Sequence, residues 1–165
     1  MQPTLPDRTQ EIAAAMARPG FYDHAPARVD VRETHISWVF LAGDRAFKLR
    51  KAVVFPFLDY GTPERRLHMC EEEMRLGRRL APDLYLALHG VVPRGDGFAL
   101  ADVGSAEACE HVVEMRRFDE EQTLAARLER GEVGEPEVRA LARTIAEFHA
   151  GAEPAPPTRR RSRSS

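Results

Sequence analysis

The 165-residue sequence contains only two cysteines, Cys70 and Cys109, and neither belongs to a C-x-x-C pair. A disulfide-dense scaffold is therefore excluded, and a reducing compartment is expected. None of the six histidines lies in an H-E-x-x-H motif or a comparable ligand spacing, so no metal site is expected. No apolar run approaches the roughly 20 residues of a membrane span, and the first residues lack the pattern of a secretory signal. The sequence thus predicts a cytoplasmic protein with no membrane partner.

Several motifs of nucleotide-binding and nucleophilic sites are also absent. The sequence has no G-x-x-x-x-G-K-[ST], no G-x-G-x-x-G and no G-x-S-x-G. A P-loop, a glycine-rich loop that covers phosphates and a nucleophile elbow are therefore not indicated.

Charge of neither sign dominates, because 26 acidic residues face 24 basic ones and the formal net charge is −2. Four of the 24 basic residues are arginines among the last seven residues, which contain no acid. The rest of the chain is therefore acidic, and nucleic acid is not an expected partner. The arginine-rich end leaves electrostatic binding of RNA or of a phosphorylated surface as an alternative.

A three-stranded antiparallel meander is predicted over residues 28–53. Its first strand alternates apolar and polar residues, and Gly43-Asp44 supplies a tight turn between the second and third strands. On the third strand Lys48 has apolar neighbours, and a buried lysine is costly unless an anion meets it. The candidate anions are a carboxylate of this chain, a ligand phosphate, or both.

A helix is predicted from Thr62 to about residue 80. Thr62 precedes a proline at the first helical position and an acid in the first turn, which is typical of a helix start. The predicted apolar line consists of Met69, Leu76 and Leu80. Glu73 falls on this line, and an acid there needs a cation opposite, for which Lys48 is the expected partner. Alternatively, Lys48 extends to solvent and Glu73 lies on the exposed flank of the helix.

The remaining elements follow from the same patterns. A first helix is predicted over residues 6–18 with Asp7 as its N-cap, and residues 55–61 are predicted to be a connection without a strand. Further strands are predicted at residues 84–92, 98–101 and 111–118, and helices at 121–130 and 136–150. The last helix has an apolar stripe of Val138, Leu141, Ala142, Ile145 and Phe148. Residues 151–165 are rich in Pro, Arg and Ser, so a disordered tail is expected.

Five sequence blocks together resemble one known family. The blocks are Glu33-Thr-His-Ile-Ser-Trp-Val-Phe-Leu41, Ala46-Phe-Lys-Leu-Arg-Lys51, Cys70-Glu-Glu-Glu-Met-Arg-Leu76, Arg78-Arg-Leu-Ala-Pro-Asp-Leu-Tyr-Leu86 and Met115-Arg-Arg-Phe118. They resemble the aminoglycoside phosphotransferase-like family, whose fold is protein kinase-like. More narrowly, they resemble its bacterial gluconate kinase-like branch, which is often fused to a P-loop ATPase domain. The resemblance extends over about residues 28–150.

The resemblance implies an α+β fold. A kinase-like N-lobe of five antiparallel strands and one packed helix would be followed by the first helices of an incomplete C-lobe. We therefore expect an N-terminal helix and loop at residues 1–27, the N-lobe at 28–118, C-lobe helices at 119–150 and the tail at 151–165. The implied parent activity is ATP-dependent phosphoryl transfer to a hydroxyl group of a small molecule.

The resemblance also implies a nucleotide site. In this family and its protein-kinase relatives, a lysine on the third strand holds the α- and β-phosphates of ATP, and a helix glutamate positions that lysine. Lys48 matches the lysine, Glu73 matches the glutamate, and Glu72 is the near alternative. The implied hinge residues beside the adenine are Met115, Arg116 and Phe118.

The C-lobe motifs of this family are absent from the sequence. No H-x-D segment occurs, and no aspartate follows Asp119 to bind Mg²⁺. We therefore expect nucleotide binding without catalysis by this chain alone, and Mg²⁺ only where a C-lobe is supplied. The expected partner is that C-lobe or a P-loop ATPase domain, and uncovered apolar surface predicts self-association. A non-catalytic binding or regulatory module is the alternative function.

Overall fold

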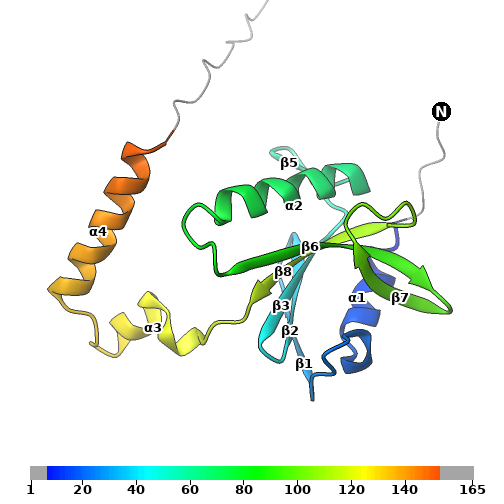
Figure 1. Cartoon of the computed structure of the whole chain (residues 1–165), viewed down its shortest axis with the longest axis horizontal. Coiled ribbons are helices and arrows are strands. Elements are labelled where there is room, and N and C mark those ends of the chain that lie inside the picture. Colours follow the sequence, from blue (N-terminus) through cyan, green and yellow to red (C-terminus); the bar gives the residue numbers. More distant parts are fainter. Residues whose placement is uncertain (1–6, 153–165) are drawn as a thin grey trace, which may run out of the picture. The chain divides into compact units, whose positions relative to one another are not determined.

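The computed structural model describes residues 7–152, which divide into two compact units with their boundary between Phe118 and Asp119 (Figure 1). The first unit is an α+β structure built on one antiparallel sheet, and the second unit is helical. No helix within residues 7–152 combines the length and the apolar character needed to cross a lipid bilayer.

A six-stranded sheet forms the centre of the first unit. Its strands are β1 (Val29–Glu33), β2 (Ser37–Ala42), β3 (Arg45–Arg50), β6 (Tyr85–Arg94), β7 (Gly97–Asp102) and β8 (Glu110–Arg116). They lie in the order β1-β2-β3-β8-β6-β7, and every neighbouring pair is antiparallel. The sheet therefore has one strand more than the five that the resemblance implied, whereas all six strands were predicted from the residue patterns. The edge strand β7, predicted at residues 98–101, pairs with β6 through a two-residue turn, and Gly95 in this turn has the positive φ, +57°, that such turns require.

The hairpin of β2 and β3 lies within the meander predicted over residues 28–53. Its turn contains Gly43 with φ +65°, as the short loop demands. Phe47 and Leu49 of β3 are buried in the larger core cluster, which includes Ile12 and Met16 of α1 (Thr9–Met16). The intervening residue Lys48 faces the opposite side of the sheet, because successive strand residues alternate in direction.

Helix α2 (Pro63–Gly77) covers that opposite side, against β8 and β6 (Figure 1). Its predicted start is confirmed, because the Thr62 hydroxyl accepts a hydrogen bond from the Arg65 amide. Its predicted apolar line is wrong, since Leu76 is 47% exposed and Leu80, beyond the end of the helix, is 57% exposed. The residues buried by this helix are instead Arg66, Cys70 and Met74. The buried face of the helix contains both apolar and charged side chains, because the charged ones pair with residues outside the helix. Hydrophobic periodicity alone does not reveal such pairing.

Two smaller predictions need correction. Residues 55–61 were expected to contain no strand, but Val54–Phe55 (β4) pairs with Leu58–Asp59 (β5) in a short hairpin. Pro56 lies in the turn of this hairpin and so does not interrupt the pairing. The first helix, predicted over residues 6–18, is the shorter α1, and its N-cap residue is Arg8 rather than the predicted Asp7. The Asp7 carboxylate nevertheless accepts a hydrogen bond from the Thr9 amide at 3.0 Å.

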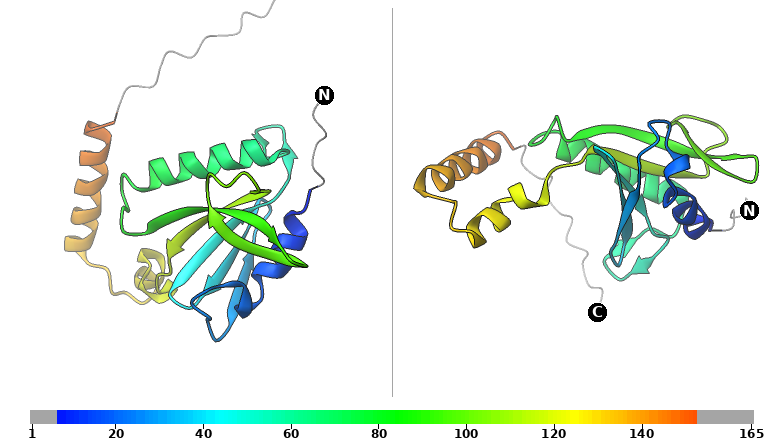
Figure 2. Two further views of the ribbon diagram at one scale, coloured as in Figure 1. Left: turned by 45° about the vertical axis from the view of Figure 1, so that its right-hand side comes forward. Right: turned by 90° about the horizontal axis from the view of Figure 1, so that it is seen from below.

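The two helices of the first unit cover opposite faces of its sheet (Figure 2). On the α1 face, Val112 of β8 joins the larger core cluster. On the α2 face, the next residue, Val113, packs with Cys70 and Met74 in a smaller cluster. The alternation along β8 therefore divides the core into two layers, one on each side of the sheet.

The second unit contains a 3₁₀ turn (Glu120–Gln122), α3 (Leu124–Glu129) and α4 (Glu135–Ala150). These correspond to the predicted helices at 121–130 and 136–150, although the first is shorter than expected. Thr123 begins α3, and its hydroxyl accepts from the Ala126 amide at 3.3 Å. The predicted disordered tail at residues 151–165 lies outside the described residues from position 153 onward.

Candidate functional site

Lys48 and Glu73 form the ion pair that the sequence analysis predicted. Lys48 lies in the middle of β3, between its strand partners Val39 of β2 and Val113 of β8. Its Nζ atom is 2.9 Å from Oε1 and 3.1 Å from Oε2 of Glu73 on α2. The side chain of Lys48 is 24% exposed and that of Glu73 is 16% exposed. The pair is thus largely enclosed, but Lys48 keeps access to solvent.

Arg50 is a second cation at the same carboxylate, and the sequence analysis did not identify it. Its Nη2 atom lies 2.5 Å from Glu73 Oε2 and donates to the Met69 carbonyl oxygen at 3.0 Å. Its Nη1 atom donates to the Tyr60 hydroxyl at 3.0 Å, and its side chain is only 5% exposed. Position 50 is two residues after Lys48 on the same strand, so the period-2 pattern already put both basic side chains on one face. This alternation was the signal in the sequence that could have identified Arg50 as a member of the cluster.

The cluster of Lys48, Arg50 and Glu73 carries one net positive charge. Uncompensated charge is costly to enclose, and the excess charge here belongs to the more exposed Lys48. An ammonium group has three N–H donors, of which two point to the Glu73 carboxylate oxygens. The cluster is therefore able to bind one anionic group through the remaining donor of Lys48.

Glu72, the near alternative to Glu73, does not join this cluster. Its carboxylate accepts from Arg75 on the same helix, with Oε1 3.0 Å from Nε and Oε2 2.6 Å from Nη2. The hydrogen bond from Arg75 lowers the pKa of Glu72 below its ordinary value. One residue along an α-helix turns a side chain by about 100°, which separates Glu72 from Glu73 on the helix surface.

The three expected hinge residues occupy different environments. Met115 of β8 pairs with Ala46 and packs against the cluster of Cys70, Met74 and Val113. Its side chain therefore lies on the Lys48 face. Arg116 is the last residue of β8 and donates from Nε to the Asp83 carbonyl oxygen. Phe118 is 58% exposed and is the final residue of the first unit.

A second buried ion pair attaches α2 to β8. Arg66 donates from Nε and Nη2 to Oε2 of Glu110, at 2.8 and 2.5 Å, and both side chains are at most 3% exposed. The remaining nitrogen, Nη1, donates to the Tyr60 carbonyl oxygen at 2.7 Å. Because the Tyr60 hydroxyl binds Arg50, this one residue contacts both buried arginines. The Arg66–Glu110 pair is fully enclosed, so its effect is to set the position of α2 relative to the sheet.

Metal binding finds no support in this part of the chain. Among residues 7–152, no three side chains of His, Cys, Asp or Glu gather in a way that could hold a metal ion. The Cys70 thiol is fully buried, and burial raises its pKa above the ordinary value. A thiol in that state is a poor nucleophile and a poor metal ligand.

The fold and the cluster together define an α+β unit in which two basic strand residues share one helix carboxylate. No family model matches this chain, and no solved structure matches it. Similar sequences are Mb2027c of Mycobacterium bovis and Rv2004c of Mycobacterium tuberculosis, both described as uncharacterized proteins. Each is 40% identical to this chain over 125 residues, which is 76% of this chain. The chain spans only 23% of the length of these relatives.

Proposed function

We propose that this chain is the nucleotide-binding part of a kinase-like phosphotransferase of the aminoglycoside phosphotransferase-like family. Lys48 binds the α- and β-phosphates of ATP, and Glu73 positions Lys48. The observation that carries this proposal is the 2.9 Å ion pair between Lys48 in the middle of β3 and Glu73 in the C-terminal half of α2. Its support from sequence is the resemblance of five blocks, two of which contain these residues.

The charge balance of the site favours a phosphate ligand. Where a phosphate competes with Glu73 for the N–H donors of Lys48, Arg50 still neutralises that carboxylate at 2.5 Å. The anion is therefore bound without leaving Glu73 as an unpaired charge, which would be costly in an enclosed position. The cluster therefore differs from a simple ion pair, in which a movement of the lysine would leave the carboxylate without a counter-charge.

An apolar surface for a base adjoins Lys48. Val39 of β2 pairs with Lys48, and Leu41 pairs with Ala46. Ala46 also pairs with Met115 of β8 on its other side, so these four side chains share the Lys48 face of the sheet. Apolar side chains beside a cation suit a nucleotide, because the flat faces of its aromatic base pack on apolar groups and its phosphates are anionic.

We expect the catalytic groups to come from elsewhere in a longer protein. This sequence has neither an H-x-D segment nor a later aspartate for Mg²⁺. The curated relatives are more than four times as long as the matched segment, since that segment is 23% of their length. A C-lobe, and a P-loop ATPase domain beside it, are the proposed partners, and phosphoryl transfer to a small-molecule hydroxyl is the proposed activity of the whole.

The test is the thermal stability of the purified chain with and without Mg·ATP. A ligand at 100 times its Kd stabilises the native state by about 2.7 kcal/mol, which raises Tm by roughly 5–10 °C in a chain of this size. We expect this rise in the wild type and its loss in Lys48→Ala. Lys51→Ala is the matched control, because Lys51 also has an ion pair, with Glu33 at 2.5 Å, yet lies outside the cluster.

Two results would overturn the proposal. A folded wild-type chain with no rise in Tm at saturating Mg·ATP has no nucleotide site. An equal rise in the wild type and in Lys48→Ala shows that nucleotide binds without the cluster. Circular dichroism of each variant before heating establishes that the comparison is made between folded proteins.

The second candidate function is a non-catalytic binding module that self-associates or docks through exposed apolar residues. It is favoured by the stripe on α4, where Val138, Leu141 and Ile145 are 54%, 43% and 45% exposed. Sedimentation of the wild type beside Ile145→Glu tests it. A concentration-dependent oligomer that Ile145→Glu dissociates, with no Tm rise from Mg·ATP, would replace the nucleotide proposal by this one.

A further inference from the structure

A cavity of about 510 Å³ opens on the face of the sheet opposite to Lys48. Phe47 lines it, and because Phe47 precedes Lys48 on β3 the two side chains leave the strand on opposite faces. The cavity is therefore separate from the proposed nucleotide site. Its volume lies within the range of sites that bind small molecules, roughly 300–1,000 Å³.

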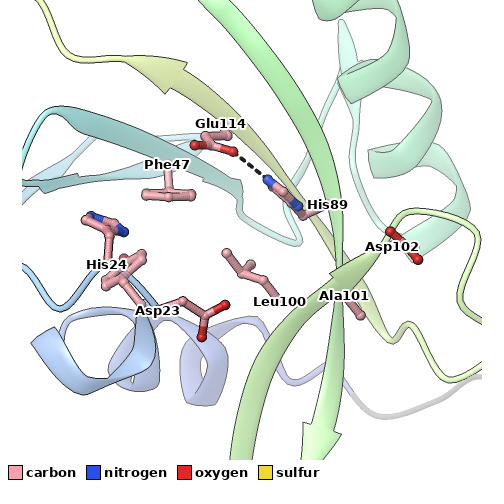
Figure 3. Close-up of a pocket in the computed structure, with 9 residues that line it drawn as sticks. Asp23, His24, Phe47, His89, Leu100, Ala101, Asp102 and Glu114 are labelled. Atoms are coloured by element: carbon pink, nitrogen blue, oxygen red, sulfur yellow. Dashed lines mark hydrogen bonds and ion pairs between the residues drawn. The ribbon is translucent and has the colours of Figure 1, made fainter.

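Strand register assembles the floor of this cavity. Phe47 of β3 pairs with Glu114 of β8, and His89 of β6 pairs with Asp102 of β7. Directly paired residues of antiparallel strands lie on the same face, so four neighbouring strands each contribute one of these side chains. His89 Nε2 and Glu114 Oε2 are 2.7 Å apart, and Figure 3 shows this contact.

Aromatic rings form one wall. The ring centroid of Phe47 is 4.8 Å from that of Tyr22 and 6.3 Å from that of His24. The Tyr22 hydroxyl donates to the Met16 carbonyl oxygen at 2.7 Å, which holds the wall against the end of α1. Tyr22 and Phe47 are at most 4% exposed, so the wall is a packed part of the core whose edge faces the cavity.

Both imidazoles of the cavity are held with the same nitrogen protonated. His24 Nε2 lies 2.9 Å from the Ala42 carbonyl oxygen, and His89 Nε2 lies 2.7 Å from a carboxylate oxygen. Carbonyl and carboxylate oxygens only accept, so each Nε2 must carry the donated hydrogen. In the neutral form, Nδ1 of each ring is then an acceptor. A neutral ring of this tautomer offers no second donor to a ligand.

Negative charge remains unbalanced at this cavity. Both oxygens of Glu114 are engaged, one by His89 and one by Arg45 Nη1 at 2.5 Å. The carboxylates of Asp23 and Asp102 line the cavity, and no hydrogen bond or ion pair engages either of them among residues 7–152. No lysine or arginine of this region lines the cavity. Figure 3 shows Asp23 across the cavity from the His89–Glu114 pair, with Leu100 between them in that view.

We propose that this cavity binds a small organic cation with N–H donors, a primary ammonium or guanidinium group attached to an apolar stem. Asp23 and Asp102 provide the charge that attracts the cation, and the imidazole Nδ1 atoms accept its hydrogens. The side chain of Leu100 and the edges of the Tyr22 and Phe47 rings border the apolar stem. A metal ion does not fit the site, because the described side chains form no metal-binding group.

Phenethylammonium is the probe, with 2-phenylethanol as its uncharged control of nearly equal shape. Binding is followed by amide chemical-shift changes of Leu100 and Ala101 in the full chain and by titration calorimetry. For a probe of this size we expect a Kd of about 1 mM or lower. We expect 2-phenylethanol to bind about tenfold or more weakly, because it lacks the charge-assisted hydrogen bonds.

Variants at the surface of the cavity complete the test. Asp23→Asn should raise the Kd about threefold to fivefold, the range for an exposed charge pair. Asp96→Asn is the control, since Asp96 is an exposed acid in the β6–β7 turn outside the cavity, and it should leave the Kd unchanged. Lys48→Ala should also leave it unchanged, because the two sites lie on opposite faces.

Three results would overturn the proposal. One is the absence of a saturable response at about 10 mM probe, ten times the expected Kd. A second is equal affinity for the alcohol and the ammonium compound, which would mean that the acids do not select the ligand. The third is an unchanged Kd in Asp23→Asn while chemical shifts elsewhere in the protein respond to the probe.

Discussion

The guanidinium of Arg50 lies 2.5 Å from the carboxylate of Glu73 and is almost completely buried, with 5% of its side chain exposed. This contact crosses from β3 to α2 beside the Lys48–Glu73 pair. Arg50 is further held by the Met69 carbonyl oxygen and the Tyr60 hydroxyl. Glu73 is therefore the partner of a fixed cation, Arg50, and of a more exposed one, Lys48.

Glu73→Gln should destabilise the first unit substantially. The substitution leaves the buried Arg50 and the neighbouring Lys48 without a negative charge, and an uncompensated buried cation costs about 3 kcal/mol. Urea denaturation followed by circular dichroism measures this as a lower midpoint with an unchanged slope. The matched control is Glu72→Gln, one residue away, whose partner Arg75 is 60% exposed. That variant should lose much less stability than Glu73→Gln, because an exposed ion pair contributes little. Equal losses in the two variants would contradict the assignment of Glu73 to the cluster.

Gly77→Ala should destabilise the protein although alanine is the better helix former. A Cβ atom at position 77 would lie 2.5 Å from Tyr85 Cζ and closer still to Cε2. Relieving such overlap in a packed region costs about 1–3 kcal/mol, which exceeds the roughly 1 kcal/mol gained in helix propensity. The midpoint of thermal unfolding should therefore fall, and a second substitution, Tyr85→Leu, should recover part of the loss.

Gly20→Ala serves as the comparison for that experiment. A Cβ atom at Gly20 would meet no heavy atom within 4 Å, so its effect should remain within about 0.5 kcal/mol. A Gly77→Ala variant as stable as Gly20→Ala would show that Tyr85 does not occupy the space next to α2.

Acid should destabilise the protein through His111. Burial lowers the pKa of this imidazole below its ordinary value of 6.5, and its Nδ1 atom has no hydrogen-bond partner among the described residues. As the pH falls through 6.5, the unfolded state takes up a proton that the folded state takes up only at lower pH. The free energy of unfolding therefore decreases from pH 6.5 downward, and His111 contributes no slope at higher pH.

Urea midpoints measured between about pH 5 and pH 8 test this dependence. We expect His111→Gln to have a flatter profile below pH 6.5 than the wild type. His68→Gln, which replaces an exposed histidine of α2, should keep the wild-type profile. An unchanged slope in His111→Gln would assign the acid sensitivity to other groups.

Much of the fold was predictable because its signals are local. Alternation along β3, the Gly43-Asp44 turn and the Thr62 N-cap each depend on residues a few positions apart, and all three are present in the structure. The predicted pairing of Lys48 with Glu73 is present, although the apolar line on which Glu73 was expected is not the buried face of α2. Two such charges of opposite sign usually compensate one another.

The partners of Arg50 were not predictable, although strand alternation put its side chain on the Lys48 face, because they belong to distant segments. Arg50 is held by Tyr60 and Glu73, which lie 10 and 23 residues further along the chain. The apolar line expected on α2 was wrong for a related reason. Its buried face contains Arg66, whose partner Glu110 is 44 residues away. Hydrophobic periodicity counts every charged residue as polar, so it does not indicate that a charged residue is buried in an ion pair.

The sequence by itself determined the positions of most strands and helices, and it indicated the α+β class and Glu73 as one of the anions open to Lys48. Tertiary structure alone decided the sheet order β1-β2-β3-β8-β6-β7, the second cation at Glu73, and the cavity behind Phe47. The physical reason is the range of the interactions. Backbone propensity and side-chain alternation act within a few residues, whereas strand order and enclosed charge clusters arise only when segments tens of residues apart are packed together.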